Sequence, residues 1–273
     1  MIPASFDYVR AESPDHAVQL LREHGDDAKL LAGGHSLLPL MKLRLATPSV
    51  LVDVGRLRDL SYVRDAGDHV AIGALTRHHD LEHSDLLDAQ VPLLKHAAGQ
   101  VGDPQVRHRG TIGGSVAHGD PASDLPAVLI ALRATLVALS PNGTREIPVD
   151  DFFTGFLETA LAPDELLTEI RVPKVPGAGW SFQKFNRRAQ DWAIVGVACV
   201  RNGSPGIGLV NLASTPLRAA AVEQAVAAGA PATDAAAAVD EGIDPPADLN
   251  ASAEYRRHLA RVLVRRALEQ SAT

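Results

Sequence analysis

Leu31-Ala-Gly-Gly-His-Ser36 holds two adjacent glycines at a point where an apolar, strand-like run gives way to a polar turn. A second pair occupies the same kind of position in Thr111-Ile-Gly-Gly-Ser115. Glycine lacks a Cβ, so such a loop can bring consecutive backbone N–H groups close to phosphate oxygens, and a helix N-terminus behind the loop adds a favourable dipole. The two loops together predict a clamp for a diphosphate.

The chain around the first loop agrees with this interpretation. Residues 29–32 predict a strand, Ser36 predicts a helix N-cap, and residues 37–45 predict the helix that follows, with Pro39 tolerated in its first turn. A single glycine pair is more often a plain connector, and the chain contains neither Gly-x-Gly-x-x-Gly nor Gly-x-x-x-x-Gly-Lys-[Ser/Thr]. Spacing alone therefore leaves flavin binding as one option among several.

Residues 32–44, residues 111–126 and, more weakly, Phe182-Gln-Lys184 and Asp191-Trp-Ala193 carry a resemblance to a known family. They are similar to the FAD-binding medium subunit of the molybdenum-containing hydroxylases, the family of the carbon monoxide dehydrogenase flavoprotein and of the FAD domain of xanthine dehydrogenase. The resemblance implies noncovalent FAD with its pyrophosphate held by both loops. It also implies an α+β fold, the PCMH-type FAD-binding fold shared by p-cresol methylhydroxylase and vanillyl-alcohol oxidase.

The resemblance also assigns single residues to the cofactor. It places Asp124 in contact with FAD, Ala117 and His118 beside the isoalloxazine ring, and Lys184 near the flavin, where a cation stabilises the anionic reduced form. The chain departs from the family at Ser115, where asparagine is common. The expected FAD-binding residues are Ala32, Gly33, Gly34, His35, Ser36, Leu37, Val101, Thr111, Ile112, Gly113, Gly114, Ser115, Ala117, His118, Asp124, Leu167, Lys184 and Trp192.

Several of these residues also have a purely structural interpretation. Lys184 equally fits a solvated strand lysine, Trp192 a core aromatic, and His35 a residue packed against its turn. Val101 and Leu167 fit either the wall of a flavin site or an ordinary apolar core.

Composition narrows the possible functions. The chain has 273 residues, 46% of them hydrophobic, which is enough for more than one domain. A formal net charge of −7 argues against a nucleic-acid surface, which needs clustered Lys and Arg. The single cysteine, Cys199, excludes an intrachain disulfide and cannot ligate an iron–sulfur cluster. No apolar run is long enough to span a membrane and the first residues do not look like a signal peptide, so we expect a cytoplasmic protein.

The order of predicted elements divides the chain into two domains. Up to about residue 175, helices alternate with strands, which indicates a mixed α/β layer. The predicted elements here are helices over residues 14–24, 91–101 and 125–132 and strands over residues 50–54, 69–75 and 135–139. Residues 141–176 are punctuated by prolines and carry no predicted element.

Beyond the proline-rich stretch the pattern changes to strands followed by helices. An antiparallel sheet is predicted from strands over residues 180–185, 193–200 and 206–213, and helices are predicted over residues 217–228, 233–241 and 252–270. We therefore expect an FAD-binding PCMH-type domain over residues 1–175 and a smaller C-terminal domain, an antiparallel sheet plus helices, over residues 176–273.

The histidines do not predict a metal site. His79 and His83 are four residues apart in a possible helix, but a catalytic zinc site normally has a third ligand, and no His-Glu-x-x-His pattern is present. A Ser-His-Asp hydrolase would need a Gly-x-Ser-x-Gly motif, which the chain lacks. We therefore expect neither metal ligands nor catalytic side chains.

The resemblance implies an oxidoreductase subunit that transfers electrons. It would take them from [2Fe-2S] clusters on a small partner chain and pass them to an external acceptor, while a large partner chain with a molybdenum cofactor hydroxylates the substrate. The expected assembly is a heterohexamer, a dimer of heterotrimers. The alternatives are a self-contained flavin oxidase or dehydrogenase of the same fold and a non-catalytic nucleotide-binding module. The substrate and the acceptor (NAD, a quinone, oxygen or a protein) stay open.

Overall fold

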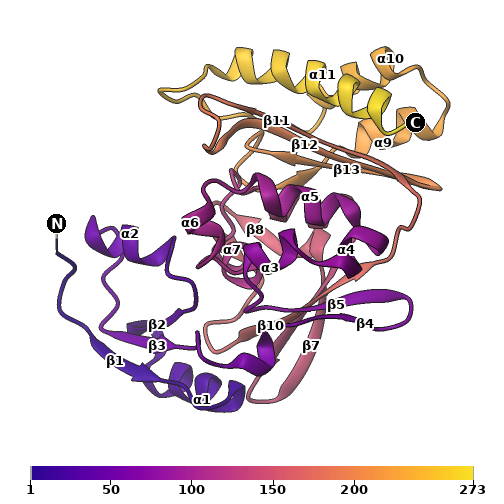
Figure 1. The fold of residues 1–273 in the computed structure, drawn as a ribbon. Helices are drawn as coiled ribbons and strands as arrows, with labels where there is room; N and C mark the ends of the chain where they lie inside the picture. Colours follow the sequence, from indigo (N-terminus) through magenta and orange to yellow (C-terminus); the bar gives the residue numbers. More distant parts are fainter. Residues whose placement is uncertain (1, 273) are drawn as a thin grey trace.

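The computed structural model describes residues 2–272, which form four β-sheets with helices packed between and around them. A small sheet near the N-terminus is followed by a five-stranded sheet, a layer of helices, a four-stranded sheet and a final layer of helices (Figure 1). The architecture is α+β, as the sequence predicts.

The N-terminal sheet is parallel, with the strand order β1 (Asp7–Arg10), β3 (Val50–Asp53), β2 (Ala28–Leu31). Helix α1 (Pro14–His24) packs against this sheet and against the five-stranded sheet. Its first turn is capped by the side chain of Ser13, which accepts a hydrogen bond from the backbone N–H of His16, and Gly25 ends it. The helix therefore has the predicted bounds.

Helix α2 (Leu37–Lys42), which follows the first glycine loop, is shorter than predicted. Arg44 adopts a left-handed conformation with φ of 57°, which a continuous α-helix does not allow. Ser36 occupies the predicted N-cap position of α2, but its backbone angles are helical and its side chain accepts no hydrogen bond from the helix, so it does not cap the helix through its hydroxyl.

The five-stranded sheet is antiparallel, with the strand order β4-β5-β10-β6-β7. Its strands are β4 (Val63–Asp65), β5 (His69–Gly73), β6 (Thr135–Ser140), β7 (Gly143–Pro148) and β10 (Leu166–Pro173). The central strand β10 lies in the proline-rich stretch for which the sequence predicts no element. A register shift between Leu167 and Glu169 interrupts the alternation of side chains that would have indicated a strand.

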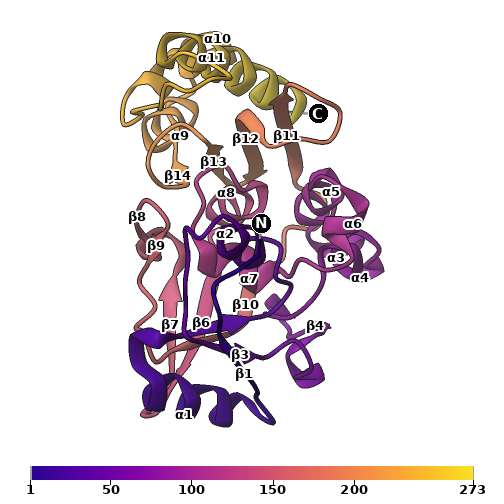
Figure 2. The ribbon, with the colours of Figure 1, turned by 90° about the vertical axis from the view of Figure 1, so that its left-hand side faces the viewer.

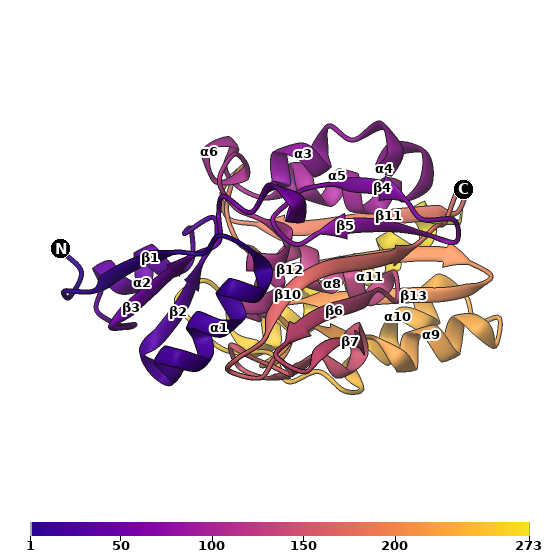
Figure 3. The ribbon, with the colours of Figure 1, turned by 90° about the horizontal axis from the view of Figure 1, so that it is seen from below.

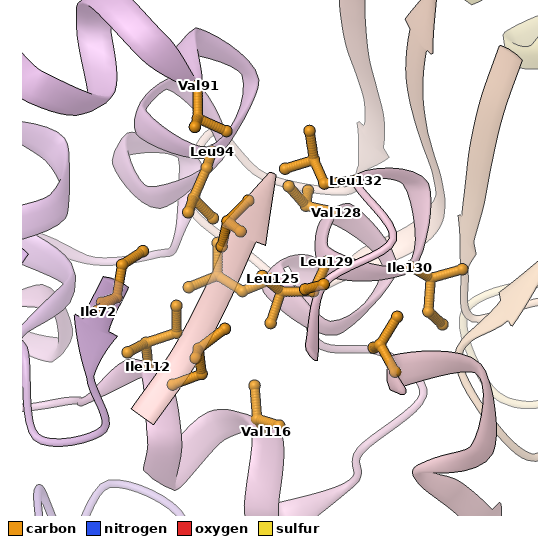
Figure 4. Packing of buried hydrophobic residues seen from close by; sticks show 14 of the residues in the cluster. Ile72, Val91, Leu94, Ile112, Val116, Leu125, Val128, Leu129, Ile130 and Leu132 are labelled. Atoms are coloured by element: carbon orange, nitrogen blue, oxygen red, sulfur yellow. The ribbon is translucent and has the colours of Figure 1, made fainter. Parts of the chain in front are cut away.

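Short helices cover one side of this sheet (Figure 3). They are α3 (His78–Glu82), α4 (Asp85–Gln90), α5 (Pro92–Gln100), α6 (Pro104–Arg107), α7 (Ile112–His118) and α8 (Asp124–Ala131). Figure 4 shows Ile72 of β5, Leu94 of α5, Ile112 of α7 and Leu125 of α8 pointing into one apolar core. Every residue of α8 is buried, Asp124 included.

The C-terminal sheet is also antiparallel, as predicted, and it is covered on both faces. Its strands are β11 (Gly179–Asn186), β12 (Ala193–Asn202), β13 (Ser204–Val210) and β14 (Leu217–Arg218), in chain order. Helices α9 (Ala220–Ala227), α10 (Ala232–Ala237) and α11 (Ala253–Gln270) cover one face, and α5 and α8 cover the other (Figure 2). The three helices predicted near the C-terminus are thus present with shorter bounds.

The remaining elements are short. They are the hairpin of β8 (Phe153–Gly155) and β9 (Glu158–Thr159) and the 3-10 turns Gly25–Asp27, Arg58–Leu60, Val149–Asp151 and Ala238–Asp240. Among residues 2–272, no helix combines the length and the apolar character that a membrane crossing requires.

Candidate dinucleotide-binding site

The two glycine loops lie against each other. A Cβ on Gly33 would stand 2.3 Å from the carbonyl oxygen of Arg109 and 2.9 Å from the Cα of Gly110, the residues that lead into the second loop. Such distances are far below a van der Waals contact, so only glycine at position 33 lets the two segments approach this closely. The tertiary structure therefore brings the two predicted phosphate loops to one place.

The first loop presents a run of unused backbone donors. None of the backbone N–H groups of residues 33–37 donates a hydrogen bond to another residue of the described chain. Gly34 has a φ of +78°, and a left-handed residue among right-handed ones turns successive N–H groups toward a common point. Because backbone donors are normally paired, this row of N–H groups fits an anionic ligand such as a diphosphate.

The sequence predicts a loop at the second glycine pair, but the structure places this pair in the first helical turn of α7. The backbone N–H groups of Ile112 and Gly113 donate to Thr76 and Ala74, at 3.0 and 2.8 Å, and that of Gly114 donates to the side chain of Thr111 at 3.1 Å. These donors are therefore engaged inside the protein. A Cβ on Gly113 would lie 2.5 Å from the Cβ of Ala74, so this glycine serves helix packing.

Helix α7 keeps one face open. Gly114 and Ala117 are exposed and Ser115 and His118 are half-buried, whereas Thr111, Ile112 and Gly113 are buried. Residues three and four apart share a helix face, which puts Gly114, Ala117 and His118 on the open side. This open face starts next to the first loop, because a Cβ on Gly114 would lie 4.0 Å from the Cβ of Ala32.

A buried ion pair lies where α8 begins. The Lys184 ammonium on β11 donates to Asp124 Oδ2 at 2.7 Å and to the carbonyl oxygen of Gln100 at 3.0 Å, and both charged side chains are 7% exposed. The interpretation of Lys184 as a solvated lysine is therefore wrong: the fold carries it into the interior. The ion pair joins β11 of the C-terminal sheet to α5 and α8.

Asp124 has spare capacity to accept a hydrogen bond. Its Oδ1 is buried and has no hydrogen-bond partner among the described residues. Burial raises the pKa of Asp124 to about 6, although the charge and hydrogen bond of Lys184 act in the opposite direction. A buried unpaired acceptor is rare in a native protein, and a ligand hydroxyl would satisfy this one. The orphaned oxygen fits the FAD contact expected for Asp124.

The other expected contacts divide into surface and core positions. Trp192 is 58% exposed, so its interpretation as a core aromatic is wrong, whereas Leu167 is 4% exposed and belongs to the main apolar core. Trp192 lines a cavity of about 670 Å³, together with Asp120, Phe156 and Arg187. This cavity does not include the glycine loops. Val101 is half-buried against the core, and His35 is exposed on the first loop.

One close contact in this region has no signal in the sequence. A Cβ on Gly102 would lie 3.0 Å from the carbonyl carbon of Gln190 and 3.2 Å from the backbone nitrogen of Asp191. The segment that carries Trp192 thus packs directly on the segment that carries Val101. A lone glycine beside Asp103-Pro104 reads as an ordinary turn, so only the tertiary structure identifies this contact.

The spacing of His79 and His83 provides no third metal ligand, but the structure supplies a candidate in Glu82. Ligand atoms of His79, Glu82 and His83 all lie within 4.8 Å of one another. Glu82 lies three residues after His79 and so falls on the same helix face.

A glycine turn that abuts the segment before α7, an open row of backbone donors and a buried carboxylate are the features of a dinucleotide-binding protein. The chain belongs to the family whose model is described as the FAD binding domain in molybdopterin dehydrogenase, which matches residues 4–175. Residues 180–271 match the C-terminal domain of the CO dehydrogenase flavoprotein. The resemblance noted in the sequence is confirmed.

Known relatives cover the whole chain. The carbon monoxide dehydrogenase medium chain of Hydrogenophaga pseudoflava is 45% identical over 98% of this chain and 97% of its own. The 6-hydroxypseudooxynicotine dehydrogenase complex subunit alpha of Paenarthrobacter nicotinovorans is 40% identical over 99% and 96%. A solved structure of the H. pseudoflava carbon monoxide dehydrogenase, which lacks the Mo-pyranopterin moiety of the molybdenum cofactor, matches with a TM-score of 0.95 at 44% identity, covering 100% of this chain and 99% of that one.

Proposed function

We propose that this chain is the FAD-binding, electron-transfer subunit of a molybdenum hydroxylase complex. The observation that carries the proposal is the row of unpaired N–H groups at residues 33–37 beside the open face of α7. Relatives named as a medium chain and as a complex subunit support a multi-chain assembly. In this proposal the partners are a small iron–sulfur chain and a large molybdenum chain, and the assembly is a dimer of heterotrimers in the cytoplasm.

The chain's own residues bind and orient the cofactor. The N–H groups of residues 33–37 hold the diphosphate, and the bare Cα of Gly114 lets the ligand approach α7. Asp124 Oδ1 accepts a hydrogen bond from a sugar or ribityl hydroxyl, and the Lys184 charge favours negative charge on the nearby ring. FAD supplies the redox chemistry, since a flavin exchanges electrons singly or in pairs.

The proposal also covers the ring end of the site, the two domains and the choice of substrate. Val101 and Trp192 border the ring end of the site, whereas Leu167 lies in the apolar core and is no longer assigned to it. Residues 1–175 and 176–273 form the FAD-binding and C-terminal domains. The hydroxylated substrate is chosen by the large chain, and the relatives differ in what their names say they oxidise, carbon monoxide or 6-hydroxypseudooxynicotine.

Absorption spectroscopy of the purified full-length chain tests cofactor binding. We expect an oxidised-flavin spectrum and FAD in the supernatant after denaturation. Gly33→Ala should weaken FAD binding at least about tenfold, which corresponds to about 1.4 kcal/mol of binding free energy, because its Cβ would displace the Arg109 carbonyl. The purified variant should therefore contain less FAD than the parent chain. Gly203→Ala is the matched control: it also adds a methyl group, its φ is +72°, and no atom lies within 4 Å of its Cβ position.

Reduction of the bound flavin tests the electron-transfer role. We expect the flavin to bleach when the co-purified complex receives the substrate of its large chain, and not when the isolated chain receives the same substrate. Bleaching of the isolated chain by a small organic substrate would instead indicate a self-contained flavin oxidase or dehydrogenase. A colourless chain, alone and in complex, would contradict FAD binding altogether.

A further inference from the structure

A group of imidazoles and one carboxylate lies outside the proposed flavin site. His79 and Glu82 belong to α3, His83 directly follows it, and the exposed His108 follows α6. Helices α3 and α6 are neighbours in Figures 1 and 2. The ring centroids of His79 and His83 are 4.2 Å apart, and those of His79 and His108 are 4.1 Å apart. The ring of His79 is thus held between two other imidazoles.

The protein fixes the tautomer of His83. Its Nδ1 lies 2.8 Å from the backbone carbonyl oxygen of His79. A carbonyl oxygen can only accept a hydrogen bond, so Nδ1 carries the hydrogen and, in the neutral ring, Nε2 keeps its lone pair. Imidazoles that bind metals are commonly oriented in this way, with the other ring nitrogen donating to a carbonyl.

The carboxylate of Glu82 is likewise held in place. Its Oε2 accepts a hydrogen bond from Arg107 Nε at 2.8 Å, and Arg107 also donates to the carbonyl oxygen of Val101 at 2.7 Å. The Glu82 side chain is 27% exposed, and a carboxylate can accept one Arg donor and still bind a cation. His78, in contrast, is 4% exposed and turned into the protein, so it is not part of this group.

We propose that His79, Glu82 and His83 form a binding site for a divalent transition-metal ion of the Zn²⁺ type. Two imidazoles and one carboxylate are ligands that Zn²⁺ accepts, whereas Mg²⁺ and Ca²⁺ prefer oxygen ligands only. The exposed side of His83 leaves room for a water ligand. The ion would rigidify the end of α3 and, through Glu82 and Arg107, hold α6 and the segment that leads into the second glycine loop.

Calorimetric titration of the untagged, chelator-stripped full-length chain with ZnCl₂ tests the proposal. We expect saturable binding of one Zn²⁺ per chain, with no comparable binding of Mg²⁺ or Ca²⁺. His83→Gln and Glu82→Gln should each weaken Zn²⁺ binding at least about tenfold. His258→Gln is the control, because His258 is an exposed histidine on α11, remote from α3.

Two further measurements distinguish metal binding at this site from misfolding of the variants. Co²⁺ in place of Zn²⁺ should give visible bands without a thiolate charge-transfer band, because Cys199 is fully buried. His83 is exposed, so His83→Gln should keep the far-UV circular dichroism and FAD content of the parent chain. Failure of the parent chain to bind Zn²⁺, or unchanged affinity in a folded His83→Gln chain, would overturn the proposal.

Discussion

At the scale of single residues, glycines that look alike in the sequence have different roles in the structure. Gly33 permits contact between two loops, and Gly113 permits a helix to pack on Ala74. Both belong to Gly-Gly pairs, and a glycine pair predicts only that the backbone is approached closely. Whether the approaching group is a ligand or another part of the chain depends on what the fold places there.

Asp124 leads to a prediction about pH. Its pKa rises from an ordinary value of 3.8 to about 6, so between these values the folded state binds a proton that the unfolded state has lost. Stability associated with this group is therefore full below about pH 4 and is lost as the pH rises through about 6, and each pKa unit corresponds to about 1.4 kcal/mol. Asp124→Asn should flatten this part of the stability profile.

Urea unfolding of the parent chain and of Asp124→Asn, measured from pH 4 to pH 7, tests this prediction. Asp59→Asn is the control, because Asp59 is exposed and the substitution removes the same charge. The prediction is contradicted if Asp124→Asn and Asp59→Asn change the profile equally.

At the scale of elements, α8 is the helix that connects the cores of the two halves. All of its residues are buried, because the FAD-domain core lies on one side and the C-terminal sheet on the other. Glycines on β13 let the helix approach: a Cβ on Gly206 or Gly208 would lie 2.0 or 1.9 Å from a carbonyl oxygen of α8. A helix that is apolar all round is expected to be buried in this way.

Gly208→Ala tests this packing. The added Cβ would collide with the Ala127 carbonyl oxygen, and overpacking of this kind costs about 1–3 kcal/mol or more. Gly203→Ala, in open space but with positive φ, should cost only about 1 kcal/mol. Thermal unfolding of both variants gives the comparison. Equal losses would mean that the α8 contact accommodates the methyl group.

The sequence predicts an element well when the residues that signal it are neighbours in the chain. Helix α1 has a Ser13 cap, an apolar face and Gly25 as its end, and it was predicted to the residue. Strand β10 was missed although Ile170 and Val172 are fully buried at the centre of a sheet. Its bulge breaks the alternation, and the prolines at positions 163 and 173 look like loop signals.

At the scale of the whole molecule, the two halves share a core. Phe182, Ala198 and Val200 of the C-terminal sheet belong to the same apolar cluster as α5 and α8. Trp180 contacts His96 of α5, with ring centroids 5.2 Å apart. Removal of either half would expose a large apolar surface, so we expect the halves to unfold together.

Two spectroscopic probes test this cooperativity. Both tryptophans, Trp180 and Trp192, lie in the C-terminal half, and Trp180 also contacts His96 of α5. Their fluorescence therefore reports the C-terminal half and its contact with the first half, whereas far-UV circular dichroism reports the helices of both halves. We expect coincident transitions in urea, measured on the full chain with FAD bound. Two separated transitions would show that the halves are independent folding units.

The sequence by itself determined the family, the α+β class, the antiparallel C-terminal sheet and the first glycine loop, because these features lie in contiguous residues. The tertiary structure decided what is held together across distance. It placed Gly33 against Arg109, buried Lys184 beside Asp124, and aligned Glu82 with two histidines. Such contacts depend on how layers pack, and packing joins residues whose separation in the chain leaves no periodic or local signal.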